Sequence, residues 1–402
     1  MKTRLLSLFI LILPASLFAQ PVPPFWSQED SAGFTPRQNL TTEVAAGKIY
    51  AMGGFDAMTG YLNTVEAYDP ITQAWSTPQT TGAMTARTAA SSEVIDGKIY
   101  VIGGQGTNDF LNQMEIFDPV SNTWSIASHV GAFKRRAGHV SAYVDGKIYV
   151  MGGIYGVGNY LTAVDVYDPV SGTVDTVIYT GTFIPRMGAT AAVVDGKIYM
   201  IGGFNGSYLN TIEAFDPITK SWSTPQTNGT LTARSDLTSV VKSGVIYTIG
   251  GYTGTEQVST FEVFIPMINT CATVVAENTM TPRMGPSASM WGNNIYVMGG
   301  MQHGALLSVN ELFNPGSSGS VAEEALRKIS LSPNPSRDIV ILSGLPQGLV
   351  QIQVVDIRGE CVLTVDATSL EVRLDISALP AGVYCVRMTI GGVSVTRNIV
   401  KQ

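Results

Sequence analysis

The sequence predicts an all-β protein in which one unit is repeated six times and a smaller β domain follows. A Gly-Gly pair recurs at intervals of 48 to 50 residues, at 53/54, 103/104, 152/153, 202/203, 250/251 and 299/300. A period of about fifty residues is typical of a repeat architecture. Glycine is abundant, with 42 of 402 residues, and charged residues make up only 14%. This composition suits short buried strands that are joined by tight turns.

Each unit places an arginine before its first turn and an acid after its Gly-Gly pair. The arginines are Arg37, Arg87, Arg136, Arg186, Arg234 and Arg283, and the acids are Glu66, Glu115, Asp165, Glu213, Glu262 and Glu311. Arginine and acid are 27 to 29 residues apart in every unit. Because a buried charge needs a partner, this constant spacing favours a structural pair inside each unit over a ring that binds a ligand.

The remaining residues of the unit carry a family resemblance. An Asp-Pro or Asn-Pro turn follows the acid in five units, and a tryptophan usually comes next, as at Trp75, Trp124 and Trp222. These residues resemble the kelch repeat, over about residues 24 to 316. The resemblance implies a six-bladed kelch β-propeller with one four-stranded blade per unit. The inner strand follows the arginine, an Asp-Gly turn leads into the second strand, and the acid and the tryptophan mark the third and fourth.

The first and last units are both incomplete. The segment around Trp26 resembles the end of a unit whose beginning is missing, whereas the last unit reaches Glu311 and lacks a tryptophan strand. We therefore expect the segment near Trp26 to supply the outer strand of the sixth blade, so that the ring has no open edge. The propeller is expected to span residues 20–315.

The N-terminus reads as an export signal. Residues 1–19 begin with Lys2 and Arg4, continue with an apolar run at 5–13, and end in small residues before an expected cut after Ala19. The apolar run is too short to span a membrane. No other segment of the sequence is long and apolar enough for a transmembrane helix.

The C-terminal region differs from the repeats. Residues 316–324 form a small polar linker, and residues 325–402 contain several strand-like runs. Residues 331–336, 355–360 and 379–384 resemble the C-terminal sorting domain of the type IX secretion system of Bacteroidetes-type bacteria. The resemblance implies a small β-sandwich that the secretion machinery recognises and that is commonly removed afterwards. It also implies a protein that is secreted or displayed on the outer cell surface.

Cysteines, histidines and net charge exclude several classes of protein. Three cysteines are too few for a dense disulfide scaffold. Cys361 and Cys385 either pair or remain two buried thiols, and Cys271 has no obvious partner. The three histidines lie in different units without ligand spacing, so we expect neither a metal site nor another cofactor. The formal net charge of −7 opposes a nucleic-acid-binding surface.

Strand alternation places the variable loops together. The loops after each Gly-Gly pair and the loops between blades share one face, whereas the uniform Asp-Gly and Asp-Pro turns lie on the other. Variable loops on a rigid scaffold are where binding is usually found. The candidate ligand-binding residues are Phe55, Gln105, Asn108, Asp109, Arg135, Tyr155, Asn159, Phe204, Asn205, Tyr252, Glu256 and His303.

These aromatic, amide and charged side chains suit a glycan or a protein ligand. The sequence offers no catalytic constellation, and it therefore favours an exported binding protein over an enzyme. The alternative is a sugar-active enzyme, because bacterial six-bladed kelch proteins include sialic acid mutarotases. In that case Glu256 and Arg135 are candidates for the acid/base group and the cationic clamp.

Overall fold

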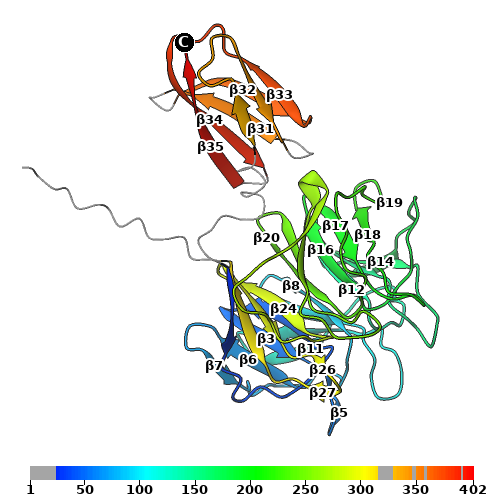
Figure 1. The fold of residues 1–402 in the computed structure, drawn as a ribbon. Coiled ribbons are helices and arrows are strands. Elements are labelled where there is room, and N and C mark those ends of the chain that lie inside the picture. The colour runs from blue at the N-terminus through cyan, green and yellow to red at the C-terminus, as the bar shows by residue number, and fades with distance from the viewer. Residues whose placement is uncertain (1–23, 316–328, 346–349, 357–359, 391–392) are drawn as a thin grey trace, which may run out of the picture.

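The computed structural model describes residues 24–315, 329–345, 350–356, 360–390 and 393–402. Strands of the first range form six four-stranded antiparallel sheets arranged as the blades of a propeller, and the later ranges form a separate β-sandwich (Figure 1). The expected signal peptide at 1–19 and linker at 316–324 lie outside the described residues. The expected propeller at 20–315 and sorting domain at 325–402 lie partly outside them.

Blades 1 to 5 each use four strands in chain order, from the inner strand to the outer strand. Blade 1 contains β2 (Thr41–Ala45), β3 (Lys48–Met52), β6 (Val65–Asp69) and β7 (Ala74–Ser76). Blade 2 contains β8 (Ser91–Ile95), β9 (Lys98–Ile102), β10 (Met114–Asp118) and β11 (Thr123–Ile126). Blade 3 contains β12 (Val140–Val144), β13 (Lys147–Met151), β14 (Val164–Asp168) and β15 (Thr173–Thr176).

Blade 4 contains β16 (Thr190–Val194), β17 (Lys197–Ile201), β18 (Ile212–Asp216) and β19 (Ser221–Ser223). Blade 5 contains β20 (Thr238–Lys242), β21 (Val245–Ile249), β22 (Phe261–Ile265) and β23 (Thr270–Thr273), and the short 3₁₀ helix η1 (Pro266–Ile268) joins its last two strands. Two small hairpins decorate the variable loops, β4 (Phe55–Asp56) with β5 (Gly60–Tyr61) and β26 (Met301–Gln302) with β27 (Ala305–Leu306).

Blade 6 is assembled from both ends of the propeller. Its strands are β24 (Ser287–Trp291), β25 (Asn294–Met298), β28 (Asn310–Asn314) and β1 (Phe25–Glu29). β1 pairs antiparallel with β28, and Trp26 lies opposite Phe313. The indole of Trp26 is buried, and its centroid lies 5.2 Å from the rings of both Phe261 and Phe313. The chain thereby covers the edge that β28 would otherwise expose.

The hydrophobic core lies between neighbouring blades. Second strands such as β17 and β21 are buried along most or all of their length. Between blades 3 and 4, for example, Met151 and Val164 share a cluster with Ile198, Met200 and Phe215. Each such side chain contributes about 1.5 to 3 kcal/mol when it is removed from water. The apolar second strand of each repeat is thus what joins one blade to the next.

Glycines fix the turns that repeat in each blade. The Asp195-Gly196 turn has positive φ at both residues, 50° and 72°, which is the geometry of a tight hairpin turn. The Gly-Gly pair serves close packing instead. A Cβ on Gly202 would lie 2.8 Å from the carbonyl oxygen of Arg234 in the next blade. The Gly-Gly pair is therefore required for contact between successive blades.

The C-terminal β-sandwich contains two sheets. One consists of β29 (Ser330–Ser332), β30 (Ile339–Ser343) and β33 (Glu371–Asp375). The other consists of β32 (Cys361–Ala367), β31 (Val350–Val355), β34 (Gly382–Ile390) and β35 (Val393–Lys401), in that spatial order. Fully buried residues from both sheets, including Val340, Leu342, Ile352 and Val386, form its core. The strands β29 and β33 were not recognised in the sequence.

The structure corrects the expectation for two cysteines. Cys361 and Cys385 both lie opposite Val355, on the two strands that flank β31. Two interstrand spacings amount to about 9.5 Å, which is too far for a disulfide. Both thiols are free, and Cys361 is exposed whereas Cys385 is half-buried. They are therefore neither a disulfide nor a pair of buried thiols.

Candidate functional site

The repeated arginines and acids lie inside the blades. Arg186 and Glu213 are both buried and form an ion pair, and the other five blades contain the same pair. Arg186 also donates hydrogen bonds to the carbonyl oxygens of Ile184, at 2.9 Å, and Gly202, at 3.0 Å. Five of the six arginines thus connect the blade-to-blade loop, the Gly-Gly pair and the third strand. Arg234 instead donates to Thr248 Oγ1 at 2.9 Å. The repeated arginines and acids are buried, and their charged groups are paired within the fold.

The variable-loop face comprises the loops after each Gly-Gly pair and the loops that connect the blades. Four of its residues associate between blades 2 and 3. Arg135 forms an ion pair with Asp109 and donates a hydrogen bond to the carbonyl oxygen of Phe110 at 3.2 Å. The ring of Phe110 packs edge-on against Tyr155, with centroids 5.7 Å apart. Tyr155 remains 44% exposed, so this group presents an aromatic face beside a charged pair.

A second group lies between blades 4 and 5 and is aromatic. Phe204 and Tyr208 have ring centroids 4.9 Å apart, and Tyr208 packs edge-on against Tyr252 at 5.6 Å. The hydroxyl of Tyr252 donates a hydrogen bond to the carbonyl oxygen of Gly254 at 2.9 Å. All three rings are half-buried. We call Phe204, Tyr208 and Tyr252 the aromatic cluster.

The remaining candidates are dispersed over the variable-loop face. Phe55 packs against Tyr61 in blade 1, and the backbone of Gln105 forms bridges within the loops of blade 2. Half-buried Asn205 and exposed Asn108, Asn159, Glu256 and His303 lie in separate loops. Arg135, the candidate cationic clamp, forms its ion pair with Asp109. The twelve predicted residues therefore form two local groups and several single positions, not one constellation.

A ring of six backbone hydrogen bonds surrounds the axis beneath the variable loops. Each member lies two residues after a repeated arginine and donates its N–H to the carbonyl oxygen of its counterpart in the preceding blade, at 2.7 to 2.9 Å. The members are Asn39, Ala89, Gly138, Gly188, Asp236 and Gly285, all with φ between 51° and 62°. We call these residues the axial ring. A small cavity of about 110 Å³ lies among them.

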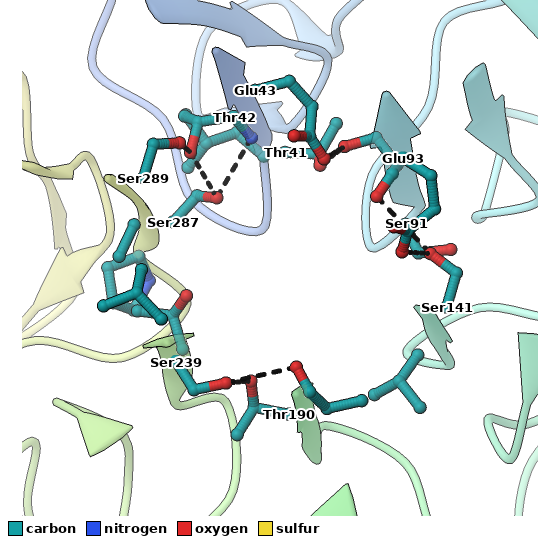
Figure 2. A pocket seen from close by; sticks show the side chains of 18 of the residues that line it. Thr41, Thr42, Glu43, Ser91, Glu93, Ser141, Thr190, Ser239, Ser287 and Ser289 are labelled. Atoms are coloured by element: carbon teal, nitrogen blue, oxygen red, sulfur yellow. Dashed lines mark hydrogen bonds between the residues drawn. The ribbon is translucent and has the colours of Figure 1, made fainter. Parts of the chain in front are cut away.

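Next to the axial ring, the inner strands enclose a channel of about 500 Å³. Figure 2 shows hydroxyl groups from several blades placed around this open space. Many of them connect neighbouring blades. Ser289 donates to Thr42 Oγ1 at 2.8 Å across the junction of blades 6 and 1, and Thr190 contacts Ser239 at 2.6 Å between blades 4 and 5. The hydroxyls thus bind the inner strands together while the channel wall stays polar.

Two carboxyl groups that were not among the predicted site residues, those of Glu43 and Glu93, lie in this wall. Glu43 accepts a hydrogen bond from Ser92 Oγ at 2.8 Å. Glu93 accepts one from Ser141 Oγ at 2.7 Å and one from the amide of Tyr143 at 3.0 Å. Burial raises the pKa of Glu43 to about 8, with a further contribution from the charge of Glu93. Burial likewise raises the pKa of Glu93 to about 7.

A comparison of the inner strands would have revealed these two residues. The third position of the strand is glutamate in blades 1 and 2, whereas the other copies have Ala142, Ala192, Val240 and Ser289. Both glutamates also lack the arginine that accompanies the repeated acids. The departure from the repeat is therefore the signal, because a residue that only serves the fold is expected to recur in every copy.

The described ranges contain neither a cluster of potential metal ligands nor a long apolar helix. No group of three or more His, Cys, Asp or Glu side chains is close enough there to hold a metal ion. His139 is buried, its Nε2 contacts Ser91 Oγ at 2.9 Å, and burial lowers the pKa of its imidazole well below the usual value. No helix in the same ranges is long and apolar enough to cross a membrane.

Comparison with protein-family models gives three matches. Residues 26–213 match the Attractin/LZTR1 beta-propeller, and residues 233–275 match the Kelch motif. Residues 330–402 match the Secretion system C-terminal sorting domain. The first match runs from β1 of blade 6 through blades 1 to 3 into β18 of blade 4, the second covers blade 5, and the third covers the β-sandwich.

Proposed function

Because the chain belongs to the kelch-repeat β-propellers and carries a type IX sorting domain that directs it to the cell surface or the medium, we propose that it is an exported binding protein. Its ligand is a glycan or a protein, and it binds through the variable-loop face. The sorting domain contacts the secretion machinery. Residues 1–19 would serve as the signal peptide for the first export step.

The aromatic cluster is the observation that supports this proposal most directly. Phe204, Tyr208 and Tyr252 come from two blades, pack against one another, and keep part of their ring surface accessible. Aromatic rings that are held rigidly supply large contact areas at low entropic cost, and this favours binding. The Arg135–Asp109 pair beside Tyr155 adds a polar element on the same face.

Ligand binding can be measured with glycan arrays and with surface pull-down experiments, using the purified chain. We expect Tyr252→Ala and Phe204→Ala to weaken binding at least tenfold, since each removes a central aromatic contact. Tyr143→Ala is the matched control, because Tyr143 is 37% exposed and precedes the Asp145-Gly146 turn on the opposite face. Unchanged affinity in both cluster variants, with folding intact, would place the binding site elsewhere.

A second candidate function is a sugar-active enzyme of the sialic acid mutarotase kind. The pair Glu43 and Glu93 supports it, because carboxyl groups with raised pKa in a polar channel suit proton transfer near neutral pH. Accelerated anomer exchange of acidic sugars that is lost in Glu43→Gln and kept in the exposed-loop variant Glu256→Gln would support this function. No acceleration by the unmodified protein would exclude it for the sugars tested.

A further inference from the structure

The last residues of the chain are hydrogen-bonded along both edges of their strand. β35 pairs with β34 along one edge, up to Lys401 opposite Gly382. Along the other edge, Ser336 donates its N–H to the carbonyl oxygen of Val400 at 2.9 Å, and its own carbonyl oxygen accepts the N–H of Gln402 at 2.9 Å. The chain end is therefore enclosed between β34 and the segment that contains Ser336.

Asn334 extends this second set of contacts with its side chain. Its Nδ2 donates to the carbonyl oxygen of Asn398 at 2.9 Å, and its Oδ1 accepts the N–H of Val400 at 2.9 Å. A carboxamide is suited to this task because it carries a donor and an acceptor on one planar group. Asn334 is exposed to solvent. A buried carboxamide needs protein partners, whereas an exposed one does not, so burial does not account for these two hydrogen bonds.

The outer strand of a sheet usually leaves the backbone groups of one edge unpaired, and β35 is the outer strand of its sheet. Here one exposed amide satisfies two backbone groups on the outer edge of β35, and Ser336 satisfies two more. The match to the sorting domain begins at residue 330 and ends at residue 402. Both partners of this contact thus belong to the region that directs export.

We propose that Asn334 is a positioning residue for export: its side chain fixes residues 398–402 in a single arrangement, and delivery by the type IX system depends on that arrangement. This role of Asn334 does not depend on what the propeller binds, and it requires no direct contact between Asn334 and the secretion machinery. Asn334 holds the chain end in the conformation in which the machinery meets it.

The structural part is tested by hydrogen exchange on the purified full chain, with the C-terminal peptide followed by mass spectrometry. In Asn334→Ala, exchange at Val400 is expected to accelerate roughly tenfold or more, because two hydrogen bonds are lost. Asn334→Asp keeps the acceptor for Val400 and loses the donor to Asn398, so it should be intermediate. Asn398→Ala is the matched control, because Asn398 contributes only its backbone carbonyl to this contact.

The functional part is tested by export of the full chain from a bacterium with a type IX system, with detection by an antibody against the propeller. The fraction outside the cell is expected to fall at least fivefold in Asn334→Ala and to remain unchanged in Asn398→Ala. Leu342→Ala provides the second comparison, because it weakens the core of the β-sandwich and removes none of the hydrogen bonds from Asn334 to residues 398 and 400. It should be exported better than an Asn334 variant of equal thermal stability.

Two outcomes would overturn the proposal. One is normal export of Asn334→Ala even though amide hydrogen exchange at residues 398–402 is accelerated. The other is equal loss of export in Leu342→Ala and in an Asn334 variant of the same stability, since this would reduce the role of Asn334 to general stabilisation. If Asn334→Ala is degraded inside the cell, the same comparison is made with Asn334→Asp.

Discussion

Arg186 and Glu213 are almost fully excluded from water, as are their counterparts in the other blades. Burial lowers the pKa of Arg186 and raises that of Glu213, while the attraction between them opposes both shifts. The charges are tolerated because the arginine also binds carbonyl oxygens and the glutamate accepts the amide of Ile184 at 3.1 Å. Each charged group therefore depends on its partner to replace the interactions with water that it loses on burial.

Removal of one partner should be costly. We expect Glu213→Ala to lower the free energy of unfolding by about 3 kcal/mol, because it leaves a buried guanidinium without a counter-charge. Chemical denaturation with circular dichroism measures this loss. Within the same blade, Lys197→Ala removes a largely exposed ion pair with Asp216 and should cost less than about 1 kcal/mol. Equal losses in the two variants would contradict the structural role of the buried pair.

The two channel glutamates make stability depend on pH. In the folded protein the pKa of Glu43 is about 8 and that of Glu93 about 7, both well above the ordinary value of a glutamate side chain. The folded state therefore retains protons that the unfolded state has released, and stability is lost as the pH rises through the folded pKa values. We expect Glu43→Gln to reduce the fall in melting temperature between about pH 5 and about pH 8.

Differential scanning fluorimetry across this pH range provides the measurement. Glu256→Gln, in an exposed loop, is the control and should leave the pH profile unchanged. Glu43→Gln should be at least as stable as the unmodified chain at alkaline pH, because an amide keeps a hydrogen-bonding group and carries no charge. A Glu43→Gln variant that loses stability only at alkaline pH would contradict this interpretation.

Among the elements, β31 keeps two cysteines apart and so prevents a disulfide between them. It lies between β32 and β34, so Cys361 and Cys385 are separated by a whole strand although both oppose Val355. Cys271 lies in β23 of blade 5, where burial raises the pKa of its thiol to about 11. The strand order thus gives each thiol a different accessibility, which the positions in the sequence do not reveal.

Thiol labelling of the native protein should follow this order. We expect Cys361 to react first with a maleimide or a thiol-exchange reagent, because it is exposed. Cys271 should react only after unfolding, because the reactive thiolate is suppressed by burial. Peptide mapping by mass spectrometry identifies the labelled residue. A disulfide between Cys361 and Cys385 in the folded chain would show that the strand order is wrong.

At the scale of the whole molecule, the propeller is a closed ring that is held together both near its axis and at its periphery. Near the axis, the axial ring connects each blade to the preceding one through a backbone hydrogen bond. At the periphery, β1 completes blade 6 by pairing with β28. Because this strand comes from the N-terminus and its partner from the end of the propeller, the closure joins the two ends of the ring.

Loss of this closure should have two effects. Trp26→Ala removes a buried ring between Phe261 and Phe313 and should cost about 3 to 5 kcal/mol. It should also promote association of the chain, because a loosened β1 exposes the edge of β28. Size-exclusion chromatography measures the association. Trp222→Ala removes a buried ring that packs on Phe183 and Phe215 in blade 4, away from β1, so self-association in both variants would contradict the special role of β1.

The sequence by itself determined the number of blades, the strands within each blade and the sorting domain. These features depend on local turns, buried strands and residues that recur at a fixed period, and such signals are visible along the chain. The departure of Glu43 and Glu93 from the repeat was visible too, but its meaning depends on which inner strands are neighbours. Sequence spacing alone did not place both carboxyls in one channel.

Tertiary structure decided how the candidate residues are distributed and which contacts cross the fold. It divided the variable-loop residues into the Arg135–Asp109 group and the aromatic cluster, because loop conformation depends on packing between blades. It also brought Asn334 to Val400, 66 residues later in the chain. Contacts of this kind have no period in the sequence, since they arise only when separate strands meet in space.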